Sequence, residues 1–125
     1  MRRGATTGLH ALGLLVAVGV VFQVFFAGLG IFGAESFELH EGFGWMLHTV
    51  SIVMVVLAIA GPRTGRAIGV AVGLLVIITV MAMLPGARDN APYLAALHPV
   101  LALFVLGLAA HIGMPMWARS RRSAV

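Results

Sequence analysis

The chain has 125 residues, of which 61% are hydrophobic and only 10% charged, whereas soluble domains carry about 25% charged residues. A soluble domain of this length could not bury so much apolar surface, so we expect one domain within a lipid bilayer. The absence of cysteine excludes disulfides, zinc–thiolate sites, iron–sulfur clusters and thiol nucleophiles. The net charge is +4, but the arginines lie in separate short segments without interleaved aromatic residues, which excludes a nucleic-acid partner.

The first apolar stretch covers residues 9–32 and follows a short basic segment that contains Arg2 and Arg3. A membrane-spanning helix needs about 20 apolar residues, which this stretch provides. A signal peptide cleaved near Gly33 and Ala34 is the alternative, but its apolar region would be only about 7–15 residues long. We therefore expect a transmembrane helix here.

Three further apolar stretches cover residues 39–60, 67–84 and 92–117. Glycine and proline mark turns at residues 61–66 and 85–90, and Asp89 or Asn90 is expected to cap the last span, with Pro92 in its first turn. Four spans joined by short loops predict an all-α transmembrane bundle with up-down topology. No internal repeat is evident, although two antiparallel helix pairs could mimic one.

The loop charges predict the orientation of the bundle. The N-terminal segment, the second loop and the C-terminal tail hold seven arginines and no acidic residue, whereas the first and third loops hold Arg88 and all four acidic residues. The positive-inside rule then places both termini in the cytoplasm. The many Ala, Gly, Val and Arg residues without lysine are typical of a GC-rich bacterial genome, so we expect the bacterial inner membrane.

Gly65, Gly69 and Gly73 recur every four residues along the third span. Small residues at this spacing allow two helix backbones to approach closely. We favour packing inside the bundle, and an oligomer interface is the alternative.

The histidines carry the main functional signal, because ionisable side chains inside membrane segments are costly and usually functional. Depth can be counted from the arginine ends of the spans at 1.5 Å per residue. This count places His10 and His111 at nearly the same depth, and places His98 roughly 20 Å nearer the opposite face. His40 matches the depth of His98 best, and His48 lies roughly 9 Å deeper.

These depths predict an inner pair, His10 with His111, and an outer pair, His98 with His48, for which His40 is the alternative. Two histidines on facing helices can ligate a haem iron from both sides. We therefore expect one or two haem b groups that pass electrons within the membrane, with a quinone or a redox complex as partner. Gln23 lies near the depth of His98 and could bond to its imidazole.

Three short segments carry a resemblance to known proteins: residues 25–33, residues 40–48 (His-Glu-Gly-Phe-Gly-Trp-Met-Leu-His) and residues 97–102 (Leu-His-Pro-Val-Leu-Ala). They resemble a family of small, functionally uncharacterised bacterial four-helix membrane proteins. The histidine layout is similar to that of small four-helix membrane cytochromes b, which hold two haems between histidines at two levels. The family resemblance implies the fold and no activity, and it points to His40, Gly44, His48, His98 and Pro99.

Two other functional classes remain open. The protein could be a non-catalytic membrane scaffold or accessory subunit whose histidines only join helices. It could also be a cation or proton conduit that uses His40, Glu41, His48 and Gln23. No hydrolytic, transferase or nucleotide-binding motif is present, so electron transfer is the only chemistry that the sequence indicates.

Overall fold

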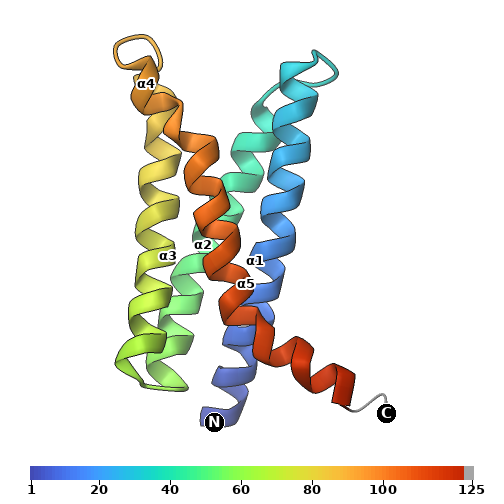
Figure 1. Ribbon diagram of the computed structural model, residues 1–125, viewed down its shortest axis with the longest axis vertical. Helices are drawn as coiled ribbons and strands as arrows, with labels where there is room; N and C mark the ends of the chain where they lie inside the picture. The colour runs from blue at the N-terminus through green and yellow to red at the C-terminus, as the bar shows by residue number, and fades with distance from the viewer. Residues whose placement is uncertain (123–125) are drawn as a thin grey trace.

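The computed structural model describes the backbone of residues 1–122 and the side chains of residues 1–115. Its elements, in chain order, are α1 (Arg2–Ile31), α2 (Glu38–Ala60), α3 (Gly65–Met83), the 3₁₀ turn η1 (Leu84–Ala87), α4 (Pro92–Ala95) and α5 (Leu97–Arg122). The long helices run up and down in sequence (Figure 1). The predicted all-α four-helix bundle is thus confirmed.

Four segments of the described chain are long and apolar enough to cross a membrane: Arg2–Ile31, Glu38–Ala60, Gly65–Ala87 and Pro92–Pro115. The chain is therefore a multi-pass integral membrane protein. The first helix begins seven residues earlier than its apolar stretch, because the polar residues 2–8 also adopt helical structure.

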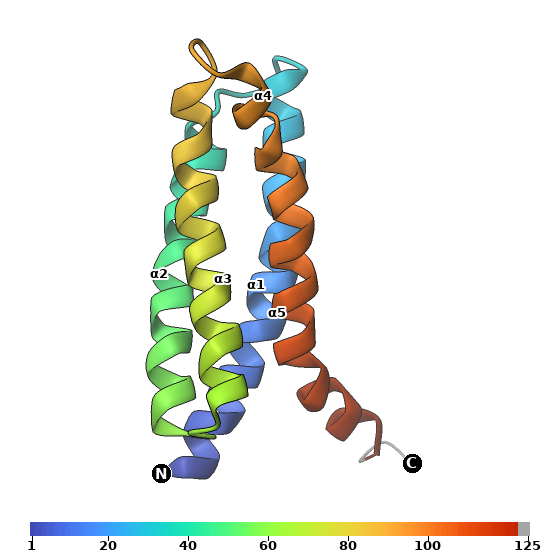
Figure 2. The ribbon, with the colours of Figure 1, turned by 60° about the vertical axis from the view of Figure 1, so that its left-hand side comes forward.

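The two ends of the bundle differ in charge. We call the end with loops 32–37 and 84–91 the acidic end, because it holds all four acidic residues of the chain. The opposite end, with the start of α1 and the loop 61–64, is the arginine end (Figure 1). Beyond Pro115, the last turns of α5 bend away from the other helices at this end (Figure 2).

Local chemistry explains where helices begin and end. At the end of α1, Gly33 has a φ of +71°, the left-handed conformation that favours glycine, and the N–H of Ala34 donates to the carbonyl of Leu29. At the start of α3, the Thr64 hydroxyl accepts from the N–H of Ala67 at 3.2 Å. These contacts fix the two tight connections.

The fourth span is divided at Ala96 into α4 and α5. Pro99 explains the division, because it has no N–H to donate to the carbonyl of Ala95. Ala91 occupies the N-cap position of α4, so the predicted cap at Asp89 or Asn90 is wrong.

The four long helices form a ring in the order α1, α2, α3, α5, in which each helix packs against its two neighbours. In this ring α2 and α5 lie diagonally opposite each other. Val16, Met54, Leu74 and Val105 contribute one fully buried apolar side chain from each helix. The core therefore lies on the bundle axis.

The helix pair α1–α2 is structurally equivalent to the pair α3–α5. Buried positions recur 58 residues apart, which relates the two pairs by an approximate twofold axis along the bundle. This recurrence of buried positions is the mimicry of a repeat that two antiparallel helix pairs were expected to allow. The equivalent buried pairs are Gly13 and Ala71, Val16 and Leu74, Val20 and Ile78, Leu47 and Val105, Ser51 and Ala109, and Met54 and Ile112.

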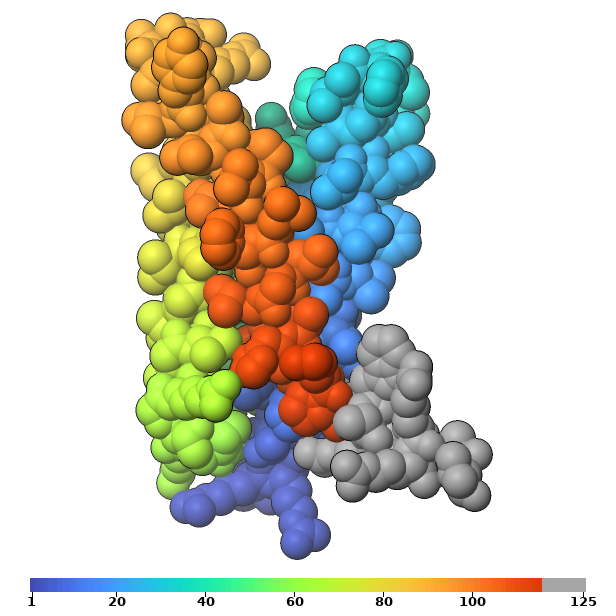
Figure 3. Space-filling view, in the orientation of Figure 1, coloured from blue at the N-terminus to red at the C-terminus, as the bar shows by residue number. Residues whose placement is uncertain are grey.

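The closest helix approach joins α1 and α5 in the arginine half of the bundle. A Cβ atom added at Gly13 would lie 2.8 Å from the backbone nitrogen of Gly113 and 3.0 Å from the carbonyl oxygen of Ala109. The two helices diverge toward the acidic end, where a cleft between them exposes part of α2 (Figure 3).

The glycine stripe of α3 faces away from the described part of the bundle. Cβ atoms added at Gly65, Gly69 or Gly73 would have no described atom within 4 Å. The interpretation of this stripe as packing inside the bundle is therefore wrong, and an oligomer interface there stays a prediction.

Candidate functional site

His40 and His98 meet across the bundle diagonal at the acidic end. Their ring centroids lie 5.9 Å apart, with an angle of 59° between the ring planes. Both side chains are half-buried. The two residues are 58 positions apart, so they are equivalents in the two helix pairs and lie beside the approximate twofold axis.

The same hydrogen bond holds each of these two rings. Nδ1 of His40 donates to the carbonyl oxygen of Gln23 at 3.1 Å, and Nδ1 of His98 donates to that of Met81 at 2.8 Å. In both cases the acceptor lies 17 residues earlier, on the preceding long helix. A carbonyl oxygen only accepts, so Nδ1 carries the proton and Nε2 of the neutral ring keeps its lone pair. Metal-bound histidines are usually held in this way.

His48 points to a different helix. Its Nε2 lies 3.0 Å from the hydroxyl oxygen of Thr79 on α3, and that hydroxyl donates to the carbonyl of Leu75. Because the single hydroxyl proton is engaged, Nε2 of His48 must be the donor to Thr79. The edge of the Trp45 ring system also packs against His48, with centroids 5.5 Å apart. The structure therefore pairs His98 with His40 and places His48 against α3.

We expect Thr79→Val to weaken the contact between α2 and α3 by about 0.6 kcal/mol, the average for interhelical hydrogen bonds in membranes. Thr49→Val is the matched control, because Thr49 also donates to a carbonyl one turn earlier but bonds to no other helix. Unfolding free energies from titration of a mild-detergent sample with dodecyl sulfate measure the difference. Equal losses of unfolding free energy in both variants would show that the hydrogen bond between His48 and Thr79 adds no stability.

Gln23 contributes its backbone, not its side chain, to the histidine pair. Gly44 lies one turn along α2 from His40. A Cβ atom added at Gly44 would lie 2.8 Å from the side-chain Nε2 of Gln23. Its Oε1 is buried and has no hydrogen-bond partner among the described residues. The predicted bond from this side chain to His98 is therefore not formed, and the side chain fills the space beside the glycine.

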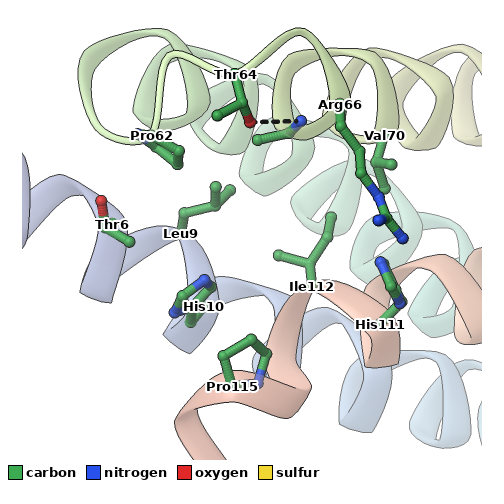
Figure 4. A pocket seen from close by; sticks show the side chains of 11 residues that line it. Thr6, Leu9, His10, Pro62, Thr64, Arg66, Val70, His111, Ile112 and Pro115 are labelled. Carbon is green, nitrogen blue, oxygen red and sulfur yellow. Dashed lines mark hydrogen bonds between the residues drawn. The ribbon is translucent and has the colours of Figure 1, made fainter.

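His10 and His111 line one cavity of about 230 Å³ at the arginine end, in accord with their predicted common depth. The other polar side chains of its wall are Thr6, Thr64 and Arg66. The His111 ring points toward the guanidinium of Arg66, and Ile112 lies between His111 and His10 in the view of Figure 4. The cavity therefore brings the inner histidines to one site without stacking their rings.

The structure gives the conduit hypothesis no continuous line of polar groups. Glu41 is exposed at the acidic end, and His48 bonds sideways to α3. Among the described residues, no group of three or more His, Asp or Glu side chains could hold a metal ion. A metal at the acidic end would therefore need a ligand that is not one of these side chains.

Sequence reasoning missed two features of these sites. The sequence indicates Arg66 only as a charge near a loop, whereas in the structure it lines the cavity with both inner histidines. The pairing of His40 with His98 has no distinguishing signal in the sequence, because leucine precedes four of the five histidines, namely His10, His40, His48 and His98. No histidine corresponds to His10, His48 or His111, because the equivalent positions hold Ile68, Leu106 and Val53.

Comparison with known sequences identifies the family. Residues 23–88 match a family of unknown function, DUF6220, and this segment includes His40 and His48. No curated protein and no solved structure matches the chain. The match supports the predicted family resemblance but not the similarity to cytochromes b, which stays a prediction. Because the matched segment makes up more than half of the 125 residues, the chain belongs to the DUF6220 family.

Proposed function

We propose that this protein binds one haem b at the acidic end, with His40 and His98 as axial ligands, and passes electrons within a bacterial inner membrane. The observation that carries the proposal is the pair of imidazoles on diagonal helices, each with Nδ1 bonded to a backbone carbonyl and Nε2 available to iron. In this proposal His40, and not the predicted His48, pairs with His98.

The spacing of the pair fits axial ligation. Two metal–nitrogen bonds of about 2 Å, with the imidazole rings beyond them, put the centroids of two axial histidines roughly 6.3 Å apart. The observed 5.9 Å is close to this value. The two centroid distances differ by about 0.4 Å.

Space for the macrocycle comes from two features. One turn along from the ligands, α2 and α5 carry the small residues Gly44 and Ala102 at equivalent positions. The cleft between α1 and α5 opens the acidic half to the side (Figure 3). The Gln23 side chain fills part of this space, but its Oε1 gives up no described hydrogen bond when it moves aside.

We do not extend the haem proposal to the inner pair, His10 and His111. Sites for small organic ligands typically measure about 300–1,000 Å³, whereas the cavity of His10 and His111 measures about 230 Å³. We therefore propose one haem rather than two. When bound, haem b supplies one-electron transfer, with a quinol or a neighbouring redox complex as the exchange partner.

A structural role is the second candidate, because each outer histidine joins two helices. His40 joins α2 to α1, His48 joins α2 to α3, and His98 joins α5 to α3. A scaffold or accessory subunit needs no more than these bonds.

An absorption spectrum separates the two candidates. The full chain is purified in mild detergent from haem-replete cells, and spectra are recorded before and after reduction with dithionite. We expect a sharp Soret band, α and β bands on reduction, and one haem per chain by pyridine haemochrome assay. A colourless protein that also takes up no added haemin would overturn the haem proposal and favour the scaffold.

A further inference from the structure

The arginine end has no acidic side chain of its own. Seven arginines lie in residues 1–8, 61–66 and 116–125, and none of these segments contains Asp or Glu. The ion pair between Arg88 and Asp89 lies at the opposite end. Within residues 1–115, Arg66 has no ion-pair partner. An anion that neutralises Arg66 must therefore come from outside these segments.

The cavity of about 230 Å³ at this end collects groups that bind anions. Arg66 extends from the start of α3 and lines the cavity, and the His111 ring of α5 points toward its guanidinium (Figure 4). Among the described residues, no acidic side chain lines the cavity, so the guanidinium of Arg66 has no anionic partner in its wall. The Thr64 hydroxyl, which accepts from Ala67, retains its own proton for donation.

The remaining wall of the cavity is apolar and includes Leu9, Val70 and Ile112. A ligand that suits this site therefore has an anionic head and an apolar body. Guanidinium groups match phosphate oxygens with paired hydrogen bonds, and basic pockets between transmembrane helices bind phospholipid head groups.

We propose that this cavity binds a phosphate group, carried by an anionic phospholipid of the adjoining leaflet, with Arg66 as the main contact and His111 beside it. Free phosphate offers the same oxygens, but the apolar wall favours the lipid. The site lies at the opposite end of the bundle from His40 and His98, so it does not depend on haem binding.

The test measures thermal unfolding of the full chain in a neutral detergent with three additives: short-chain phosphatidylglycerol, short-chain phosphatidylcholine and inorganic phosphate. We expect phosphatidylglycerol to raise Tm by about 3–6 °C, because a ligand that binds only the folded state stabilises it. Phosphatidylcholine, whose head group has no net charge, should raise Tm much less.

Arg66→Gln should remove the effect of phosphatidylglycerol. Arg63→Gln is the matched control, because it removes the same charge three residues earlier in the chain, and Arg63 does not line the cavity. Each variant is compared with its own sample without additive. If Arg66→Gln does not fold, His111→Gln replaces it and should reduce the shift by roughly half.

The outcomes separate the sources of phosphate. A shift with phosphatidylglycerol that depends on Arg66 supports the lipid, and a shift with inorganic phosphate alone that depends on Arg66 supports a phosphate site but assigns it to the free ion. Equal responses to phosphatidylglycerol and phosphatidylcholine would overturn the proposal. So would equal losses in Arg66→Gln and Arg63→Gln, or no response to any additive.

Discussion

Replacing either His40 or His98 with alanine is expected to abolish the low-spin haem spectrum, whereas His48→Ala should leave it intact. Each of the two alanine variants removes one imidazole from the pair that we propose to hold the haem, whose ring centroids lie 5.9 Å apart. Removing the hydrogen-bond partner of a metal ligand weakens metal binding by roughly 10–100-fold. Removing the ligand itself should weaken haem binding by more than this. Haem content and the reduced α band measure the effect.

Two controls sharpen this prediction. His48→Ala removes a half-buried histidine of α2 that bonds to Thr79 instead of facing His98. His111→Ala removes a histidine at the arginine end. If His48→Ala loses the haem while His40→Ala keeps it, the ligand pair is wrong even though haem is bound. Added imidazole should restore part of the low-spin spectrum in His98→Ala, because it can occupy the vacated axial position.

The largest effect on stability is expected from Gly13→Ala. The new Cβ would meet the backbone of Gly113 and Ala109 at 2.8 and 3.0 Å, and backbone atoms cannot rotate aside as a side-chain end can. The axes of α1 and α5 must therefore move apart. Overpacking of this kind typically lowers the free energy of unfolding by about 1–3 kcal/mol. We expect Tm to fall by roughly 4–10 °C.

Gly69→Ala is the control for this substitution. It adds the same methyl group to a helix interior, but no described atom lies within 4 Å of the new Cβ. Circular dichroism melting of both variants in the same detergent makes the comparison. If Gly69→Ala destabilises as much as Gly13→Ala, the effect is one of helical glycine itself and not of the α1–α5 contact.

The positions of the spans were predictable because hydropathy and turn residues are local signals. The four apolar stretches and the turns at Gly61 and Pro85 agree with the helices to within a few residues, except at the start of α1. The division of the fourth span at Ala96 was predictable from Pro99. Proline has no N–H, so the hydrogen bond to the carbonyl four residues earlier is missing. The orientation in the membrane stays a prediction from the arginines.

The rotation of each helix was not predictable in the same way. Helices that are apolar on every side carry little amphipathic signal, so the sequence does not show which face is inside. The predicted face of Gly69 on α3 is therefore wrong, and the depth count leaves His40 and His48 as alternatives. Depth alone did bring His10 and His111 to one cavity, since the rise per residue is fixed.

The approximate twofold axis explains why two histidines match while the other three do not. A side chain beside such an axis meets its own equivalent from the other helix pair, as happens in a homodimer. A change at His40 alone would therefore leave His98 facing an unlike neighbour. Positions away from the axis have different neighbours in the two helix pairs. Ile68, Leu106 and Val53 could thus differ freely from His10, His48 and His111. The fold combines similar residues beside the axis, where His40 meets His98, with positions away from the axis that can acquire separate chemistry in each helix pair.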